Sequence, residues 1–504
     1  MAAKKIKNHH TLRWLIQIFF LVLFIFFFTQ TRYGIPARLQ NLFFRFDPLI
    51  LIITSIAYRA VIAAALLSIF LIIGTFVFGR FFCGFICPLG TIIDIFDSII
   101  SHSPPVIKIP SFKNGKYLIL LFLIISAFLG SSFVHFFDPL VIFERSLTLL
   151  LYPVISYFAG LFALIPNAVF IETFIALIFF LTILGLGFIA PRFWCRNLCP
   201  LGGLLAFLSK FSVFKFTFFE SCTKCKICED ICPTKAIDSE TQKIDSAECI
   251  NCLRCQYECP QTAIKYRINL LIVPFDIKKR QFITTLGASL VAVPLAKSLI
   301  HTKLEGLLIR PPGSIPEKDF LNVCIHCGMC MKVCPTNGLQ PCILEAGING
   351  LWTPKLVSRI GGCEKNCNKC GQICPTSAIR KLSLEEKSYA KIGTAVIDRS
   401  RCIAWEQDKV CLICDEICPY NAISSLNETI RETTLLRPFV DERICTGCGL
   451  CESRCPIEGQ AAIQVFSIGE ERITKGSYIT DEKTRLRESE EKLEDIPSGF
   501  IIEE

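Results

Sequence analysis

The chain begins with long hydrophobic runs and ends in a more polar, cysteine-rich part. Residues 12–29 are nearly continuous Leu, Ile and Phe, and at about 1.5 Å per helical residue such a run approaches the length of a membrane span. The run over 48–78 exceeds one crossing, so we expect a span over 58–78 and an interfacial segment before it. A third span is expected over 117–137.

Two further apolar runs, 146–166 and 168–190, are separated only by a Pro-Asn pair. Lys and Arg collect in short cytoplasmic loops, and three basic segments should therefore share one side, with an even number of crossings between them. This requires 146–166, which contains Pro153 and Gly160, to be re-entrant or interfacial. About four spans result, with a fifth crossing as the alternative. The basic segments are 4–13, 80–116 and 192–215.

A dithiol motif occurs twice at the ends of these runs. RFFCGFICPLG at 80–90 returns as RFWCRNLCPLG at 192–202. Each copy follows an apolar hairpin, so the membrane part is expected to be duplicated, with four thiols meeting at one pseudo-symmetric place. They could ligate a metal such as copper, hold an extra cluster or form a reversible disulfide, whereas a single pair would read as two buried small residues. The thiols are Cys83, Cys87, Cys195 and Cys199.

Two cysteine motifs with C-x2-C-x2-C-x3-C-P spacing follow directly. This is the bacterial two-cluster ferredoxin signature, in which three thiolates hold one 4Fe-4S cluster and the fourth reaches its neighbour. Zinc sites need two CxxC pairs separated by a longer insert, which these motifs lack. We therefore group Cys222, Cys225, Cys228 with Cys259, and Cys249, Cys252, Cys255 with Cys232.

Four further motifs lie after residue 320. The first and last keep the regular spacing, while the second and third widen their first gap but keep four thiols each. The sequence therefore predicts six 4Fe-4S clusters and leaves open which motifs exchange their fourth ligands. Of the 29 cysteines, Cys342 remains and is expected to be a packed helix residue. The motifs contain Cys324, Cys327, Cys330, Cys334; Cys363, Cys367, Cys370, Cys374; Cys402, Cys411, Cys414, Cys418; and Cys445, Cys448, Cys451, Cys455.

Composition supports this division. A mean hydropathy of +0.49 and 43 Phe exclude a single ordinary soluble domain. Six histidines are too few for rows of haem ligands. The net charge of +9 is accounted for by the basic loops, so no nucleic-acid partner is expected. No GxGxxG turn supports a soluble nucleotide-dependent dehydrogenase.

Between the two parts, a basic triplet precedes about 16 mildly apolar residues in the stretch 271–310. KRQFI resembles a twin-arginine export signal in which Lys279 replaces the first arginine. An uncleaved anchor would leave 211–270 cytoplasmic and place 311–468 on the outer face. An amphipathic connector, with everything cytoplasmic, is the alternative. The end of the chain, 469–504, is expected to be a solvated charged tail.

These motifs carry a family resemblance. Residues 12–270, with paired CxxxCPLG motifs and a two-cluster ferredoxin, resemble NapH/MauN-type polyferredoxin membrane proteins and their NosR-type and CcoG-type relatives. Residues 277–465 resemble NapG/MauM-type ferredoxins. The chain therefore looks like a fusion of the two. The expected fold is an α-helical membrane domain, 1–210, followed by α+β ferredoxin-like modules, one with two clusters and one with four.

The resemblance implies a multi-pass protein of a bacterial or archaeal cytoplasmic membrane that passes electrons from the quinol pool through its clusters to a reductase or cytochrome, as a subunit of a quinol dehydrogenase system. Oxidation of quinol requires a proton acceptor, and ionisable groups at membrane depth are costly and often functional. The alternative function is redox maturation of a partner enzyme, with copper or disulfide chemistry at the CxxxCP thiols. Candidates for the quinol site at one membrane edge are His135, Asp138, Glu144 and Glu172.

Overall fold

The structure is a computed structural model, and two compact units form in it. The first comprises Met1–Ile155, Glu172–Leu299 and Leu321–Cys327, and the second comprises Ser156–Ile171, Ile300–Phe320 and Gly328–Glu504. The described residues are 2–32, 39–63, 66–100, 114–161, 168–170, 173–269, 279–298, 308–430, 433–481 and 483–484.

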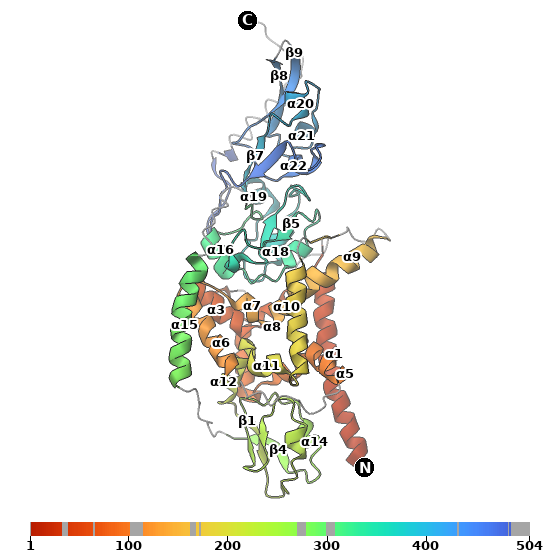
Figure 1. Ribbon diagram of the computed structural model, residues 1–504, viewed down its shortest axis with the longest axis vertical. Coiled ribbons are helices and arrows are strands. Elements are labelled where there is room, and N and C mark those ends of the chain that lie inside the picture. Colours follow the sequence, from red (N-terminus) through yellow and green to blue (C-terminus); the bar gives the residue numbers. More distant parts are fainter. Residues whose placement is uncertain are drawn as a thin grey trace. The chain divides into compact units, whose positions relative to one another are not determined.

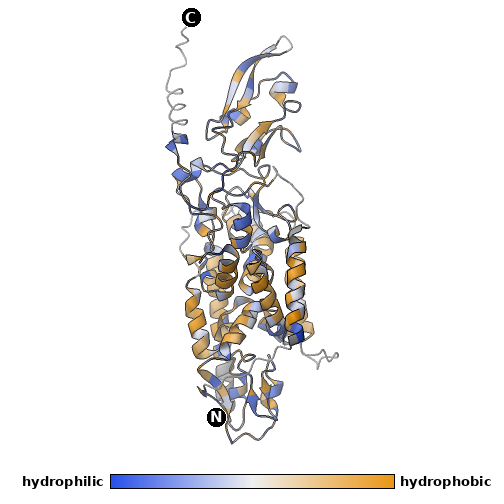
Figure 2. Cartoon of the chain, turned by 90° about the vertical axis from the view of Figure 1, so that its left-hand side faces the viewer, coloured by the Kyte–Doolittle hydropathy of each residue, from blue (hydrophilic) through white to orange (hydrophobic). Residues whose placement is uncertain are grey.

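The first unit contains a helical bundle whose elements recur in the same order (Figure 1). Figure 2 shows that hydrophobic residues dominate these helices. The helices up to residue 209 are α1 Ala2–Gln30, α2 Leu42–Arg45, α3 Pro48–Tyr58, α4 Ser68–Phe78, η2 Phe82–Ile86, α5 Pro88–Ile99, α6 Gly115–Phe128, α7 Val134–Phe137, α8 Pro139–Ser146, η3 Leu147–Leu151, α9 Tyr152–Gly160, α10 Phe174–Gly185, η4 Leu186–Phe188, α11 Phe193–Asn197 and α12 Pro200–Ser209. The last five residues of α9, 156–160, belong to the second unit.

The repeat is also visible at two helix starts. Phe-Asp-Pro-Leu occurs at 46–49 and at 137–140, and in each copy the aspartate caps the following helix while the proline occupies its first turn. The Oδ1 atoms of Asp47 and Asp138 each accept two backbone N–H groups at 2.8–3.3 Å. Caps of this kind stabilise a helix by about 1 kcal/mol. They make α3 and α8 equivalent elements of the two repeats.

The helix boundaries differ from the expected spans. A helix over 12–29 is present within α1, but 58–78 is not one helix, because α3 ends at Tyr58 with Arg59 in the left-handed region and α4 begins only at Ser68. The helix expected over 117–137 ends at Phe128, before a turn and α7.

No break occurs at the proline of the segment 146–166. Pro153 cannot donate a backbone hydrogen bond, and the π-helical turn η3 before it absorbs the mismatch, so helical structure continues from Pro139 to Gly160. Within the described residues, two helices are long and apolar enough to cross a membrane, Thr11–Gln30 and Pro139–Gly160.

Helix α15, Lys279–Ser298, occupies the stretch expected to be a signal-like anchor. It packs along α6 in the first unit, and Asn114 Nδ2 donates to Gln281 Oε1 at 3.1 Å near the start of both helices. Its 20 residues contain Pro294, and it is not among the helices apolar enough to pass the membrane criterion.

The two-cluster ferredoxin region has a small α+β fold. Strands β1 Phe214–Phe218 and β4 Ile264–Ile268 pair antiparallel, as do β2 Ile237–Asp238 and β3 Lys243–Ile244. Two short helices, α13 Ile227–Asp230 and α14 Arg254–Tyr257, carry cysteines of the two motifs. Phe216 and Ile264 are buried between them, so the strands close the back of the cysteine loops.

The second unit repeats this pattern of short helices and two-stranded sheets. Its sheets pair β5 with β6, β7 with β10, and β8 with β9, all antiparallel. The region from residue 317 onward contains α16 Glu317–Val323, α17 Met329–Lys332, β5 Leu339–Pro341, η5 Ile348–Gly350, β6 Pro354–Leu356, α18 Lys369–Ile373, α19 Leu384–Tyr389, β7 Thr394–Ile397, α20 Ile403–Glu406, α21 Ile413–Glu416, β8 Ile423–Ile430, β9 Thr433–Val440, α22 Leu450–Arg454 and β10 Ile463–Phe466.

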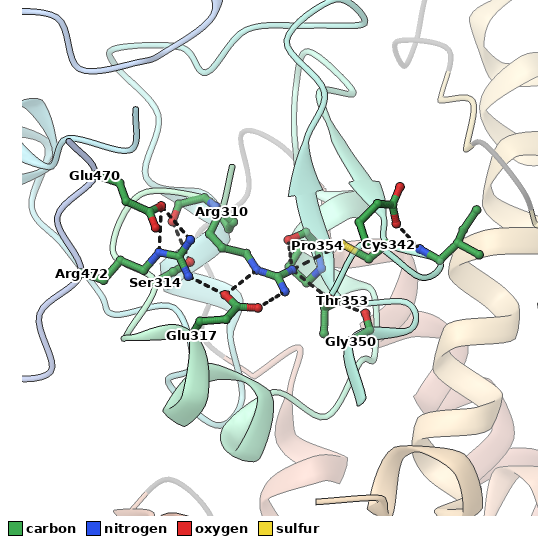
Figure 3. A network of polar contacts seen from close by, with 12 residues as sticks. Arg310, Ser314, Glu317, Cys342, Gly350, Thr353, Pro354, Glu470 and Arg472 are labelled. Atoms are coloured by element: carbon green, nitrogen blue, oxygen red, sulfur yellow. Dashed lines mark hydrogen bonds and ion pairs between the residues drawn. The ribbon is translucent and has the colours of Figure 1, made fainter. Parts of the chain in front are cut away.

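A buried arginine organises the start of this unit (Figure 3). Arg310 is 1% exposed and donates to Thr353 Oγ1 at 2.9 Å, to the Pro354 carbonyl at 2.8 Å and to Glu317. Its Nη1 also lies 3.6 Å from Cys342 Sγ. Cys342 is buried as expected, but it follows β5 and is not in a helix. Its thiol packs against a guanidinium.

Part of the stretch expected to be a solvated tail is folded into this unit. Arg472 pairs with Glu470 at 2.7 Å and with Glu317, which joins it to the Arg310 network. Tyr478 is 1% exposed and packs on Leu382 and Ala390. Residues 485–504 lie outside the described residues.

The Arg310 network predicts a pH-dependent contribution to stability. Although burial raises the pKa of Glu317, Arg310 and Arg472 hold it below its usual value. A carboxylate with a lowered pKa stabilises the fold above its unfolded pKa of about 4.3, and this contribution is lost as the pH falls through the folded pKa. We expect Glu317→Gln to lower the free energy of unfolding of this region by about 1–2 kcal/mol at pH 6–8, because Arg310 loses its buried partner while Glu317 itself is partly exposed.

Hydrogen exchange of the region around α16 at pH 5, 6 and 8 measures this effect. The loss of unfolding free energy in Glu317→Gln should be the same at pH 8 and pH 6. If the variant and the wild type were already equally stable at pH 6, the lowered pKa of Glu317 would be contradicted.

Candidate functional site

The two CxxxCP motifs form matching helix starts. Cys87 caps α5 and Cys199 caps α12, and in each case proline follows as the first helical residue. Their Sγ atoms accept backbone N–H groups from Gly90 at 3.4 Å and Gly202 at 3.3 Å. Both thiols are buried, which disfavours a free thiolate, and the backbone donors at the helix N-terminus offset part of this cost.

Two buried arginines cross between the repeats at these thiols. Arg192, from the second copy, donates to Asp94 of the first copy with Nε–Oδ1 2.6 Å and Nη2–Oδ2 2.7 Å, and to the Cys83 carbonyl at 2.9 Å. Arg80, from the first copy, is 1% exposed and lies against Gly202 of the second. A buried guanidinium near each thiol pair compensates thiolate charge.

The four CxxxCP thiols are grouped together. Cys87 and Cys199 each lie within electrostatic range of both Cys83 and Cys195. In the described part of the chain, no three His, Cys, Asp or Glu side chains converge closely enough to hold one metal ion. The group is a set of two dithiol pairs that face each other across the repeat.

A cysteine loop of the two-cluster ferredoxin sits directly on the first of these pairs. A Cβ atom at Gly84, between Cys83 and Cys87, would overlap the Ile250 carbonyl oxygen, so only glycine permits this approach. Asn251 Nδ2 donates to the Phe78 carbonyl, which also accepts from Tyr266 Oη at 2.9 Å. The Cys249–Cys252 loop is therefore held against the end of α4 and the CxxxC turn.

Within this ferredoxin, the thiols fall into two groups. Cys228 lies near Cys222, Cys225 and Cys259, and Cys255 lies near Cys249, Cys252 and Cys232. The exchanged fourth cysteines, Cys232 and Cys259, each accept a backbone N–H at 3.3 Å. The second group contains the loop on Gly84, so it is the group nearest the CxxxCP thiols.

Burial makes these thiols poor anions on their own. Burial raises the pKa of Cys249 to about 12 and that of Cys228 to about 11, with neighbouring cysteines adding to the rise. Grouped buried thiols become thiolates when a positively charged centre binds them. The donor sets thus fit iron-sulfur clusters.

In the second unit, the thiols fall into sets that combine cysteines of two motifs, a grouping that spacing alone left open. One cavity, with an empty volume of about 390 Å³, is lined by thiols of the third of these motifs and by Cys455, and its other walls are apolar. A second, of about 320 Å³, is lined by thiols of the last motif and by Cys418. Cys370 lies near Cys363, Cys367 and Cys334. The sets are Cys402, Cys411, Cys414, Cys455; Cys445, Cys448, Cys451, Cys418; and Cys363, Cys367, Cys370, Cys334.

The expected quinol-site residues have different surroundings. His135, on α7, is fully buried, and its two ring nitrogens have no hydrogen-bond partner among the described residues. Its ring stacks on His326, from the Leu321–Cys327 part of the first unit, with centroids 3.6 Å apart. Asp138 and Glu144 are buried on α8, and Glu172 lies outside the described residues.

Two residues that contact these candidates were not predicted from the sequence. Asp47 is buried and interacts with Asp138, and the repeated Phe-Asp-Pro-Leu would have revealed it. Arg145 donates to the His135 carbonyl at 3.0 Å and lies within electrostatic range of Cys327. No local pattern marks Arg145, because its partners lie on other elements.

Family models match most of the cysteine motifs. A model described as a 4Fe-4S binding domain matches twice, at residues 60–106 and 172–218, and each match contains one CxxxCP motif. Models described as 4Fe-4S dicluster domains match residues 218–260, 248–339 and 409–458. The fold and thiol sets thus define an iron-sulfur electron-transfer protein with several 4Fe-4S ferredoxin domains.

Curated relatives identify the family. The methylamine utilization ferredoxin-type protein MauM of Methylorubrum extorquens is 36% identical over 177 residues, which are 33% of this chain and 75% of the relative. The ferredoxin-type protein NapG of Escherichia coli is 33% identical over 188 residues, 36% of this chain and 80% of the relative. An uncharacterised protein of Methanocaldococcus jannaschii is 29% identical over 41% of this chain and 72% of its own length. The chain belongs to the MauM/NapG-type ferredoxin family.

A substitution at Gly84 tests whether the close backbone contact holds the Cys249–Cys252 loop in place. We expect Gly84→Ala to displace this loop, because the new methyl group meets backbone and not a flexible side chain. Hydrogen exchange of residues 249–252 should accelerate about tenfold. Gly185→Ala is the matched control, since a Cβ there meets nothing within 4 Å. Equal exchange in both variants would show that the close approach does not hold the loop.

Proposed function

We propose that this protein is a membrane-bound electron conduit that passes electrons between the quinol pool and a redox-protein partner through its ferredoxin domains. The observation that carries the proposal is the seating of the Cys249–Cys252 loop on Gly84, between the CxxxC thiols. Close packing of two thiol sites suits electron transfer, and burial of the contact excludes water. The resemblance of residues 12–270 to NapH/MauN-type proteins agrees with this function.

The five thiol sets would supply ligands for five clusters, and we assign a sixth cluster to the motif that begins at Cys324. Six 4Fe-4S clusters, when bound, supply one-electron transfer, which suits a two-electron donor such as quinol. Backbone N–H groups donate to the Sγ atoms of Cys418 at 3.3 Å and Cys445 at 3.4 Å, and such donors tune a cluster's potential. We assign the CxxxCP thiols to an additional centre of the same class, because both matches of the 4Fe-4S binding domain contain them.

His135 is our candidate for the proton-accepting residue. It is buried, its ring nitrogens have no partner in the described residues, and its ring lies on His326, one residue before Cys327. A bound hydroxyl group could satisfy those nitrogens, and a buried polar group without a partner calls for such an explanation. Asp138, which caps α8, and Glu144, which lies on α8, remain secondary candidates.

Membrane crossing is part of the proposal. Thr11–Gln30 and Pro139–Gly160 are long and apolar enough, and α15 is about 30 Å long at 20 residues. In Figure 1, α7 lies at the opposite end of the first unit from β1 and β4, and α15 runs along α6 between these ends. Helix α15 has the length of a span but less hydropathy than Thr11–Gln30 and Pro139–Gly160, and we propose it as an anchor in a bacterial or archaeal cytoplasmic membrane, with 211–270 cytoplasmic and 311–468 on the outer face.

The runner-up function is redox maturation of a partner enzyme. It is favoured by the four grouped CxxxCP thiols, which could bind copper or cycle as disulfides. The two functions differ in metal content and in their response to quinol.

One experiment separates them. Iron, copper and sulfide are measured on anaerobically purified protein, and EPR spectra are recorded before and after a quinol analogue is added. The conduit predicts about 24 or more irons per chain and cluster signals that grow with quinol. Full clusters that ignore quinol, with copper retained unless Cys83 and Cys195 are replaced, would overturn the conduit and favour maturation.

His135 yields a second prediction. His135→Phe should slow quinol-dependent reduction of the clusters by about 100-fold, the lower end of typical general-base contributions, without changing iron content. Tyr157→Phe, at an exposed aromatic residue of α9, is the control. Unchanged reduction kinetics in the His135 variant would remove this residue from the site.

A further inference from the structure

The two repeats differ at one position beside the thiols. In the first copy, Asp94 neutralises Arg192 and also accepts from Arg13 of α1 at 2.6 Å. Aligning the CxxxCPLG motifs matches Asp94 with Ala206 in the second copy. The second copy therefore faces an arginine, Arg80 of the first copy, but has no acid of its own at the matching place.

The two-cluster ferredoxin supplies an acid there. Glu248, directly before Cys249, lies 3.8 Å from Arg80, and Arg80 Nη1 donates to the neighbouring Ala247 carbonyl at 2.7 Å. Lys116 Nζ donates to both oxygens of Glu248 at 2.6 and 2.7 Å. Ala247 packs on Ala206 itself.

The basic partners correspond as well. Arg13 lies on α1, which packs on η2 and α5 of the first copy, and Lys116 lies on α6, which packs on α11 and α12 of the second. In each repeat, one carboxylate thus joins the arginine of the other copy's CxxxCP motif to a base on the repeat's own first helix. In the second repeat that carboxylate comes from outside the bundle.

We propose that Glu248 is a positioning residue, which completes the second repeat in place of the missing acid and so locks the two-cluster ferredoxin onto the CxxxCP thiols in one orientation. This inference deepens the proposed function and rests on it for the meaning of the contact. The lock selects the group of Cys249, Cys252, Cys255 and Cys232, and not the other group, as the one beside the bundle.

The burial of these charged side chains favours one docked orientation of the ferredoxin. The side chains of Arg80, Lys116 and Glu248 are 1%, 0% and 5% exposed. Burying two cations without the acid would be costly, because removing one partner of a buried charge pair leaves the other uncompensated. Glu248 supplies this acid to Lys116 and Arg80 only when the ferredoxin is docked, so docking is coupled to neutralisation.

The test compares buried and exposed acids of the same module in the full-length protein. Glu248→Gln should accelerate hydrogen exchange of residues 247–252 about tenfold or more, and Lys116→Met should do the same without altering a residue next to a cysteine. Glu240→Gln is the matched control, because its pair with Lys226 at 2.8 Å is exposed and contributes little. Iron content is measured in each variant.

A second variant separates docking from general stability. Glu248→Gln should also lower the hydrogen-exchange protection of α6 and α12, because Arg80 and Lys116 lose their acid. Adding A206D gives Arg80 an acid within the bundle, so this protection should return while residues 247–252 still exchange rapidly. Wild-type exchange in both Glu248→Gln and Lys116→Met, or equal acceleration in Glu240→Gln, would overturn the proposal. Exchange is measured without an electron donor, so failure of quinol reduction would reject the conduit but leave the lock intact.

Discussion

Two arginines that are buried beside thiols constrain the whole first unit. A guanidinium in a protein interior needs a carboxylate and further acceptors, since the desolvation cost is several kcal/mol per ion. Arg192 meets this need with Asp94 and the Cys83 carbonyl, and so ties the second repeat to the first. Arg80 meets it with Ala247 and Glu248, and so ties the bundle to the ferredoxin. The same charges favour thiolates at the CxxxCP motifs.

This arrangement lets a duplicated bundle bind the two-cluster ferredoxin in a single orientation. Two identical repeats would offer equivalent faces, and a ferredoxin could bind either. Gly84 corresponds to Arg196 in the second copy, and Asp94 corresponds to Ala206, so the two differences act together. The first copy provides both the open backbone on which Ile250 rests and Arg80, and the second copy leaves that arginine without an acid at Ala206. A single orientation satisfies both.

The family relationship covers only part of this. The MauM and NapG relatives align with about a third of the chain, whereas the repeated 4Fe-4S binding domain at 60–106 and 172–218 lies in the bundle. The chain therefore combines ferredoxin domains with a helical unit that has its own thiol sites. The two-cluster ferredoxin contacts the helical unit through the buried ion pairs of Glu248, and this contact is specific because only a matching acid satisfies the buried bases.

The sequence by itself indicated the iron-sulfur chemistry, because the spacing of the cysteines within each motif is local and survives folding. It also determined the duplication, since whole motifs recur. Tertiary structure decided the rest, because the deciding partners are far apart in the chain. Spacing could not reveal that Cys455 joins Cys402, that Glu248 neutralises Arg80, or that His135 lies on His326. Helix boundaries such as the break after Tyr58 and the continuation through Pro153 were decided by backbone hydrogen bonding, which hydropathy does not encode.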